Sequence, residues 1–110
     1  MSSVEQLIEK ARIAQQVYEN YDQGAVDEVV TAIAWAFIEP GRNRDLSQMA
    51  VETTGLGKIE DKILKNERKT LGLLRDLRSA KSVGIISEDE ELGITEIARP
   101  VGVVAAVTPV

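Results

Sequence analysis

The sequence predicts an α/β fold in which about four helices are followed by a β-hairpin and one further strand. Apolar residues recur at helical spacing over residues 3–79, and glycine or proline marks most of the breaks. Two short β-like runs then flank an acidic turn. Finally, Val101–Val107 is almost wholly apolar. With 110 residues the chain has room for one small domain.

The four helices are expected at residues 3–21, 25–38, 42–53 and 59–79. Ser2 with Glu5, and Ser3 with Gln6, have the spacing of a capping box at the start of the first helix. The second helix has almost no polar side chain after Thr31, so we expect it to be buried on most sides.

Glycine and proline are expected to separate the later helices. Glu39-Pro40-Gly41 should end the second helix, and Gly55 should cap the third. Gly72 lies inside the fourth helix and costs about 1 kcal/mol relative to alanine unless close packing requires it.

Two strands are expected at residues 82–87 and 94–98, and a third at 101–107. A continuous apolar run of this last kind is typical of a strand covered on both faces, as in a parallel sheet. Such a strand needs parallel neighbouring strands, and the sequence predicts none. We therefore expect the chain either to be part of a longer protein or to pair with another chain.

Composition excludes several classes of function. The net charge of -5 argues against binding to nucleic acid or anionic lipid. No apolar run approaches the roughly 20 residues of a membrane helix. There is no cysteine or histidine, so thiol and imidazole chemistry are unavailable and no metal site is expected. The lack of cysteine fits a cytoplasmic location.

Several separated motifs carry a resemblance to a known family. Residues 50–57, residues 60–66 and residues 93–109 resemble the N-terminal region of CoA-acylating aldehyde dehydrogenases, with the sulfoacetaldehyde and acetaldehyde enzymes as the nearest branch. Lys10-Ala11-Arg12 and Tyr18 also fit the start of such proteins. The resemblance covers essentially the whole chain but only about the first quarter of a family member, which implies a fragment.

The resemblance implies a division of the chain into three parts. Residues 1–80 would be the N-terminal helical region, and residues 81–99 two strands of an oligomerisation element. Residues 100–110 would be the first strand and loop of a Rossmann-like nucleotide-binding domain, so the aldehyde dehydrogenase fold is incomplete here. The implied assembly is a homo-oligomer, with the rest of the parent enzyme or sister subunits as partners.

The resemblance also implies a chemistry. In the family a cysteine thiolate attacks the aldehyde, hydride passes to NAD or NADP, and the thioester is transferred to coenzyme A. With no cysteine here, no catalytic residue is carried over, and the chain alone is expected to be inactive. Only Thr108 and Pro109 match a cofactor-facing position, because ligands bind beyond the carboxyl end of such a strand.

Other clusters of residues have a structural interpretation beside a functional one. Gly55-Leu56-Gly57 could be a phosphate loop, but no strand precedes it and a helix cap is favoured. Trp35 and Phe37 could stack on a ligand, but inside an apolar helix they are favoured as core or subunit-contact residues.

The charged clusters also have a structural and a functional interpretation. The basic arc of the fourth helix could bind nucleic acid or a CoA phosphate, but acidic residues lie among its cations and a solvated face is favoured; the arc comprises Lys62, Lys65, Arg68, Lys69, Arg75 and Arg78. The acidic run 88–91 is favoured as a plain turn over a cation site. Glu52 and Glu60 are favoured as surface residues over a catalytic pair.

Two alternatives to an enzyme segment stay open. The chain could be a non-catalytic oligomerisation or interaction module, because its strands and apolar helix need covering. It could also be a degenerate relic without activity.

Overall fold

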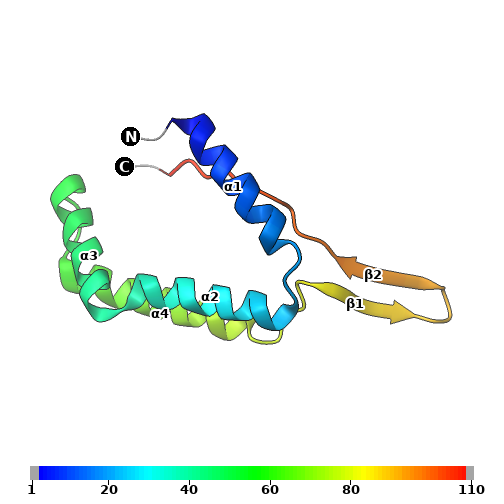
Figure 1. The fold of residues 1–110 in the computed structure, drawn as a ribbon. Coiled ribbons are helices and arrows are strands. Elements are labelled where there is room, and N and C mark those ends of the chain that lie inside the picture. Colours follow the sequence, from blue (N-terminus) through cyan, green and yellow to red (C-terminus); the bar gives the residue numbers. More distant parts are fainter. Residues whose placement is uncertain (1–2, 109–110) are drawn as a thin grey trace. The chain divides into compact units, whose positions relative to one another are not determined.

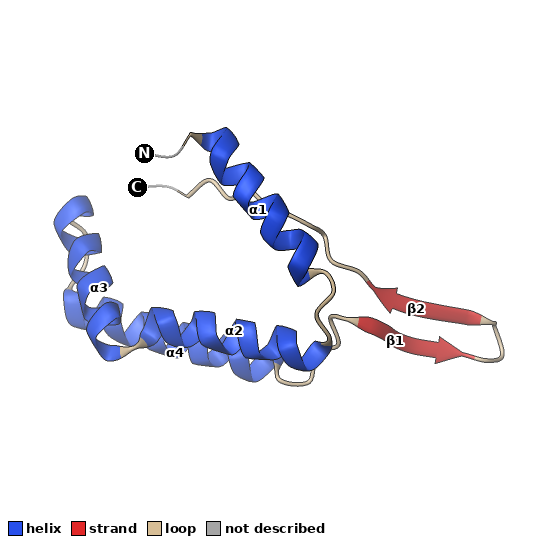
Figure 2. Ribbon diagram, viewed as in Figure 1, coloured by secondary structure: helices blue, strands red, loops and turns tan. Residues whose placement is uncertain are grey.

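The computed structural model describes residues 3–108 and contains four helices and one two-stranded sheet (Figures 1 and 2). This confirms the α/β class. The elements in chain order are α1 (Val4–Tyr18), α2 (Gln23–Ile38), α3 (Pro40–Thr54), α4 (Ile59–Leu77), β1 (Gly84–Asp89) and β2 (Ile94–Ala98).

The chain forms two compact units, which are described separately. The first contains residues up to Asp27 together with Lys81–Val107, and the second contains Glu28–Ala80. The three-part division inferred from the family resemblance stays a prediction.

Side-chain caps explain where the helices begin. Ser3 Oγ accepts a hydrogen bond from the backbone N–H of Gln6 at 3.2 Å, and Gln6 Oε1 accepts one from Ser3 N–H at 3.0 Å. This is the predicted capping box of α1. The alternative box at Ser2 lies outside the described residues. Two orphan N–H groups at the start of α1 are thereby satisfied.

Caps also correct two predicted boundaries. Asp22 Oδ1 accepts from Ala25 N–H at 2.8 Å, and α2 begins at Gln23 instead of Ala25. Glu39 accepts from Gly41 N–H at 3.1 Å and from Arg42 N–H at 3.0 Å, so α3 begins at Pro40 instead of Arg42. Proline suits the first turn of a helix, because its missing N–H would have no intrahelical partner there.

The two glycines of α3 and α4 provide a matched pair of substitutions. Gly55 ends α3 in the left-handed region at φ 68°, and its N–H bonds to Val51 O at 2.8 Å. We expect Gly55→Ala to lower the free energy of unfolding by about 1 kcal/mol because of backbone strain alone. Gly72→Ala should raise it by about 1 kcal/mol, because Gly72 is helical and an added Cβ meets no atom within 4 Å. Thermal melts of the two variants should shift in opposite directions.

The second unit contains a polar contact between α3 and α4. Asn43 and Ser47 are 2% and 1% exposed, and they are the buried residues among those described. Asn66 Nδ2 donates to Asn43 Oδ1 at 2.9 Å and to Ser47 Oγ at 3.3 Å. Asn43 Nδ2 donates to the backbone oxygen of Ile63 at 3.1 Å. Hydrogen bonds between polar side chains therefore join α3 and α4.

The hairpin of the first unit is antiparallel, as predicted. Its register pairs Gly84 with Ala98 and Asp89 with Ile94, and a bulge interrupts it between Ile85 and Ser87. β1 runs over Gly84–Asp89 instead of residues 82–87. Glu88 and Asp89 of the acidic run end β1, and Glu90 and Glu91 begin the turn. Asp89 Oδ1 accepts from Leu92 N–H at 2.9 Å, which supports the structural interpretation of that run.

Residues 101–108 contain no strand, which corrects the third strand predicted from the apolar run. A strand exists only where its backbone N–H and C=O groups pair with a neighbour. The one sheet within residues 3–108 is the β1–β2 pair, so this segment has no strand to join.

α2 is exposed, contrary to the prediction that it is buried on most sides. It has no buried residue, and the described chain has no buried hydrophobic residue at all. Burial needs covering elements, and within the second unit no element encloses this helix.

Candidate functional site

One cavity of the first unit lies between α1 and the extended segment that follows the hairpin. α1 contributes Ile8, Arg12, Gln15 and Gln16, which lie at helical spacing on one face. Val103 and Ala105 line the other side of a space of about 490 Å³. The segment thus presents alternate residues to α1, as an extended backbone requires.

The amide of Gln15 is the polar group of this cavity that lacks a partner. Its Nε2 atom is buried and has no hydrogen-bond partner among the described residues. A buried amide without an acceptor costs about 1–3 kcal/mol.

The cofactor-facing role predicted for Thr108 and Pro109 stays a prediction. Thr108 is exposed, and Pro109 lies outside the described residues. Dinucleotides bind where the carboxyl ends of parallel strands meet helix N-termini. The described residues hold one antiparallel hairpin and no such edge. They do not fit NAD or NADP by themselves.

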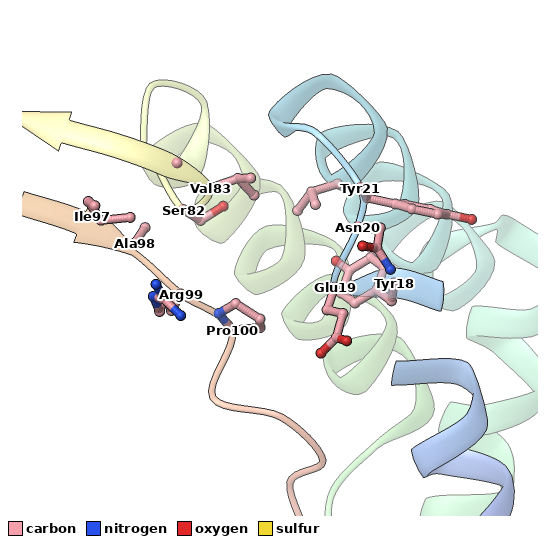
Figure 3. A pocket seen from close by; sticks show the side chains of 12 residues that line it. Tyr18, Glu19, Asn20, Tyr21, Ser82, Val83, Ile97, Ala98, Arg99 and Pro100 are labelled. Atoms are coloured by element: carbon pink, nitrogen blue, oxygen red, sulfur yellow. The ribbon is translucent and has the colours of Figure 1, made fainter. Parts of the chain in front are cut away.

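A larger cavity of about 710 Å³ lies at the base of the hairpin. The end of α1 and the turn after it provide Tyr18, Glu19, Asn20 and Tyr21 on one side (Figure 3). The hairpin base and the Arg99-Pro100 segment line the other side. The rings of Tyr18 and Tyr21 meet edge to face, with centroids 5.4 Å apart.

Gln23 holds the base of the hairpin in place. Its Oε1 accepts from the N–H groups of Ser82 at 2.8 Å and Val83 at 3.1 Å. Its Nε2 donates to Ser82 Oγ at 3.0 Å and to Asp27 Oδ1 at 2.9 Å. Because Gln23 binds the N–H groups of Ser82 and Val83, β1 begins only at Gly84. Sequence patterns did not indicate this role, since glutamine at a helix start is unremarkable.

Both cavities contain a cation and amide groups, and the larger one also contains the carboxylate of Glu19 and the phenols of Tyr18 and Tyr21. The sequence provides no thiol or imidazole for either. Among residues 3–108 no group of three acidic side chains is placed to hold a metal ion. No helix in the described part is long and apolar enough to cross a membrane.

The structural interpretations of two clusters are confirmed. Gly55 and Gly57 have φ values of 68° and 79° and follow a helix end instead of a strand. Glu52 and Glu60 are exposed, and Glu52 accepts a hydrogen bond from Gln48 Nε2 at 2.7 Å.

The cations of α4 lie on a largely solvated face, as favoured. Within the described chain the ion pair on this helix joins the adjacent Arg75 and Asp76 at 3.0 Å. A pair of this exposed kind contributes little to stability.

The carboxylate of Glu39 has a lowered pKa. The cause is first the hydrogen bond from Arg42 N–H and then that from Gly41 N–H; burial opposes them, and the Arg42 charge adds to them. Because the folded pKa lies below the ordinary 4.5, this cap stabilises α3 above that pH. The stabilisation is lost as pH falls through the lowered pKa.

Acid titration should therefore reveal the cap. Glu39→Gln should weaken α3 at neutral pH, and the difference in thermal midpoint from the parent should vanish in acid. Glu52→Gln, which changes an exposed carboxylate near the other end of α3, is the control and should show no such convergence. A parallel pH dependence of the two variants would contradict the assignment.

Known proteins align with nearly the whole chain. It is 57% identical over 107 residues to the acylating sulfoacetaldehyde dehydrogenase of Cupriavidus necator, covering 97% of this chain and 22% of that protein. It is 45% identical over 109 residues to the acylating sulfoacetaldehyde dehydrogenase of Bilophila wadsworthia, covering 99% and 24%. It is 38% identical over 109 residues to the acetylating succinate-semialdehyde dehydrogenase of Clostridium kluyveri, covering 98% and 23%.

The chain thus spans less than a quarter of the length of these relatives. The sequence matches no protein-family model. The family resemblance carried by its motifs is nevertheless confirmed by the identities, which extend over helices, hairpin and apolar segment together. By sequence, the chain corresponds to the N-terminal part of the acylating aldehyde dehydrogenases.

Proposed function

We propose that this chain is the N-terminal segment of an NAD(P)-dependent, CoA-acylating aldehyde dehydrogenase. The overall reaction converts an aldehyde, coenzyme A and NAD(P)⁺ into acyl-CoA and NAD(P)H. The observation that carries the proposal is 57% identity over 97% of the chain to an acylating sulfoacetaldehyde dehydrogenase. The proposed enzyme is cytoplasmic.

These 110 residues have a supporting part in the reaction. The covalent step requires a thiolate, and the sequence contains no cysteine, so the nucleophile must come from polypeptide beyond this segment. Thr108 and Pro109 are proposed to face the cofactor only once parallel strands flank residues 101–107 and create a carboxyl edge.

Intact mass and activity of the native protein test the proposal. A native mass several times 12.0 kDa is expected, with acyl-CoA and NAD(P)H formed from one of sulfoacetaldehyde, succinate semialdehyde or acetaldehyde. The 110-residue chain alone should form neither product. A native mass near 12.0 kDa, or a longer protein inactive with all three aldehydes, would overturn it.

The hairpin supports a second, non-catalytic role in assembly. Ile85, Ile86, Ile94 and Ile97 are exposed, and each strand has one unpaired edge within the described residues. Such edges are normally covered by another chain or element. We infer that the hairpin contributes to a homo-oligomer. Sedimentation of the longer protein should show an oligomer that Ile85→Lys dissociates, and a monomeric parent would contradict this role.

A further inference from the structure

The surface of the chain is larger than that of a compact protein of the same mass. Its accessible area is 9323 Å². A compact body of half its mass exposes about 3600 Å², so two bodies of that size that did not touch would expose about 7200 Å² in total. An excess of about 2000 Å² therefore remains however the two units are placed.

Part of the apolar surface that needs covering belongs to α2. From Val29 to Ile38 the helix carries no charged side chain. Ile33, Trp35 and Phe37 are 65%, 57% and 40% exposed. Within the second unit, α3 and α4 form a packed pair, and α2 has no comparable partner there.

The exposed residues of α2 lie on opposite sides of the helix. At about 100° per residue, Ile33 and Phe37 are about 40° apart, whereas Trp35 lies about 160° from each. A single flat surface, such as that of a second copy in a dimer, would cover one of these sides and leave the other in water. A helix that is apolar all round is a helix enclosed in a core.

The size of the excess area favours a permanent covering surface for α2. A standard protein–protein interface covers about 800 Å² on each partner, well below the excess here, whereas permanent interfaces cover about 1000–2500 Å² on each. In the relatives this segment is 22–24% of the chain, so more than three quarters of the polypeptide is available to cover it.

We propose that both sides of α2 are enclosed by the remaining polypeptide of the longer enzyme, so that α2 is a core helix of a domain formed mostly by residues beyond this segment. The inference rests on the proposed function in one respect: it requires that this chain is part of a longer enzyme. In this arrangement one surface of the remaining polypeptide covers Ile33 and Phe37, and a different surface covers Trp35.

Trp35 allows a direct test because it is the one tryptophan of the sequence. The longer protein and the 110-residue chain are each labelled with 5-fluorotryptophan, and Trp35→Phe identifies the fluorine resonance of Trp35. A soluble gadolinium chelate should broaden this resonance in the short chain and leave it sharp in the longer protein. Equal broadening in the two proteins would overturn the inference.

The same samples distinguish the alternatives. Protection that appears in the short chain as its concentration rises would assign α2 to a second copy and overturn the inference. Acyl-CoA formation is measured in parallel. An active enzyme with an accessible Trp35 would refute the inference alone, whereas a protected Trp35 in an inactive protein would refute the proposed function alone.

A charged substitution provides a second test in the longer protein. Ile33→Glu should abolish its cooperative thermal transition or its soluble expression. The matched control is Leu92→Glu, since Leu92 is 71% exposed but lies in the hairpin turn beside acidic residues. A longer protein that tolerates both substitutions equally would overturn the inference.

Discussion

Replacing Asn43 by alanine should lower the free energy of unfolding of the α3–α4 unit by about 2–3 kcal/mol. The substitution removes the acceptor of Asn66 Nδ2 at 2.9 Å and the donor to Ile63 O at 3.1 Å. Since Asn43 is 2% exposed, water does not readily replace these bonds. Asn66 retains a contact of 3.3 Å to Ser47 Oγ, which offsets part of the loss.

Urea titration followed by circular dichroism measures this effect. The control is Gln48→Ala, which removes an amide of α3 that is exposed and bonded to Glu52 at 2.7 Å. We expect a change of less than about 0.5 kcal/mol for the control. Equal effects of the two variants would show that the buried amide network does not hold α3 and α4 together.

Replacing Gln23 by methionine should detach the base of the hairpin from the start of α2. Methionine keeps the length of the side chain but removes the acceptor of Ser82 N–H at 2.8 Å and of Val83 N–H at 3.1 Å. It also removes the donor to Ser82 Oγ at 3.0 Å. At about 0.5–1.5 kcal/mol for each net hydrogen bond, the local loss is about 2 kcal/mol.

Hydrogen exchange resolves this loss by residue. The amides of Ser82 and Val83 should exchange about 30-fold faster in Gln23→Met, because 2 kcal/mol corresponds to that factor in the opening equilibrium. Gln16→Met is the control: its side chain forms no bond to the hairpin in the described structure, so the two amides should be unaffected. Unchanged exchange in Gln23→Met would refute the anchoring role.

Local patterns predicted the elements of this chain well. The period of the apolar residues placed all four helices, and Ser3, Gln6 and Gly55 marked two ends through bonds that span only a few residues. Boundaries were wrong where a cap was not recognised. Asp22 and Glu39 start their helices earlier than the apolar pattern suggests, because their carboxylates accept backbone N–H groups.

Contacts distant in sequence could not be predicted. Asn43 meets Asn66 across 23 positions and Gln23 meets Ser82 across 59, and no local pattern indicates either pair. The bulge between Ile85 and Ser87 depends in the same way on how two strands align. Of the predicted cofactor-facing residues, Thr108 is exposed and lies beside no parallel strand.

Residue types and their spacing were enough to indicate the four helices, the hairpin, the family and the absence of a thiol from this segment. Each of these depends on residue identity and on interactions within a few positions of the chain. The folded arrangement was needed to show that residues 101–108 form no strand and that α2 is exposed. Strand pairing and side-chain burial depend on which other parts of the polypeptide are present. A run of apolar residues indicates that it must be covered, but it does not show what covers it.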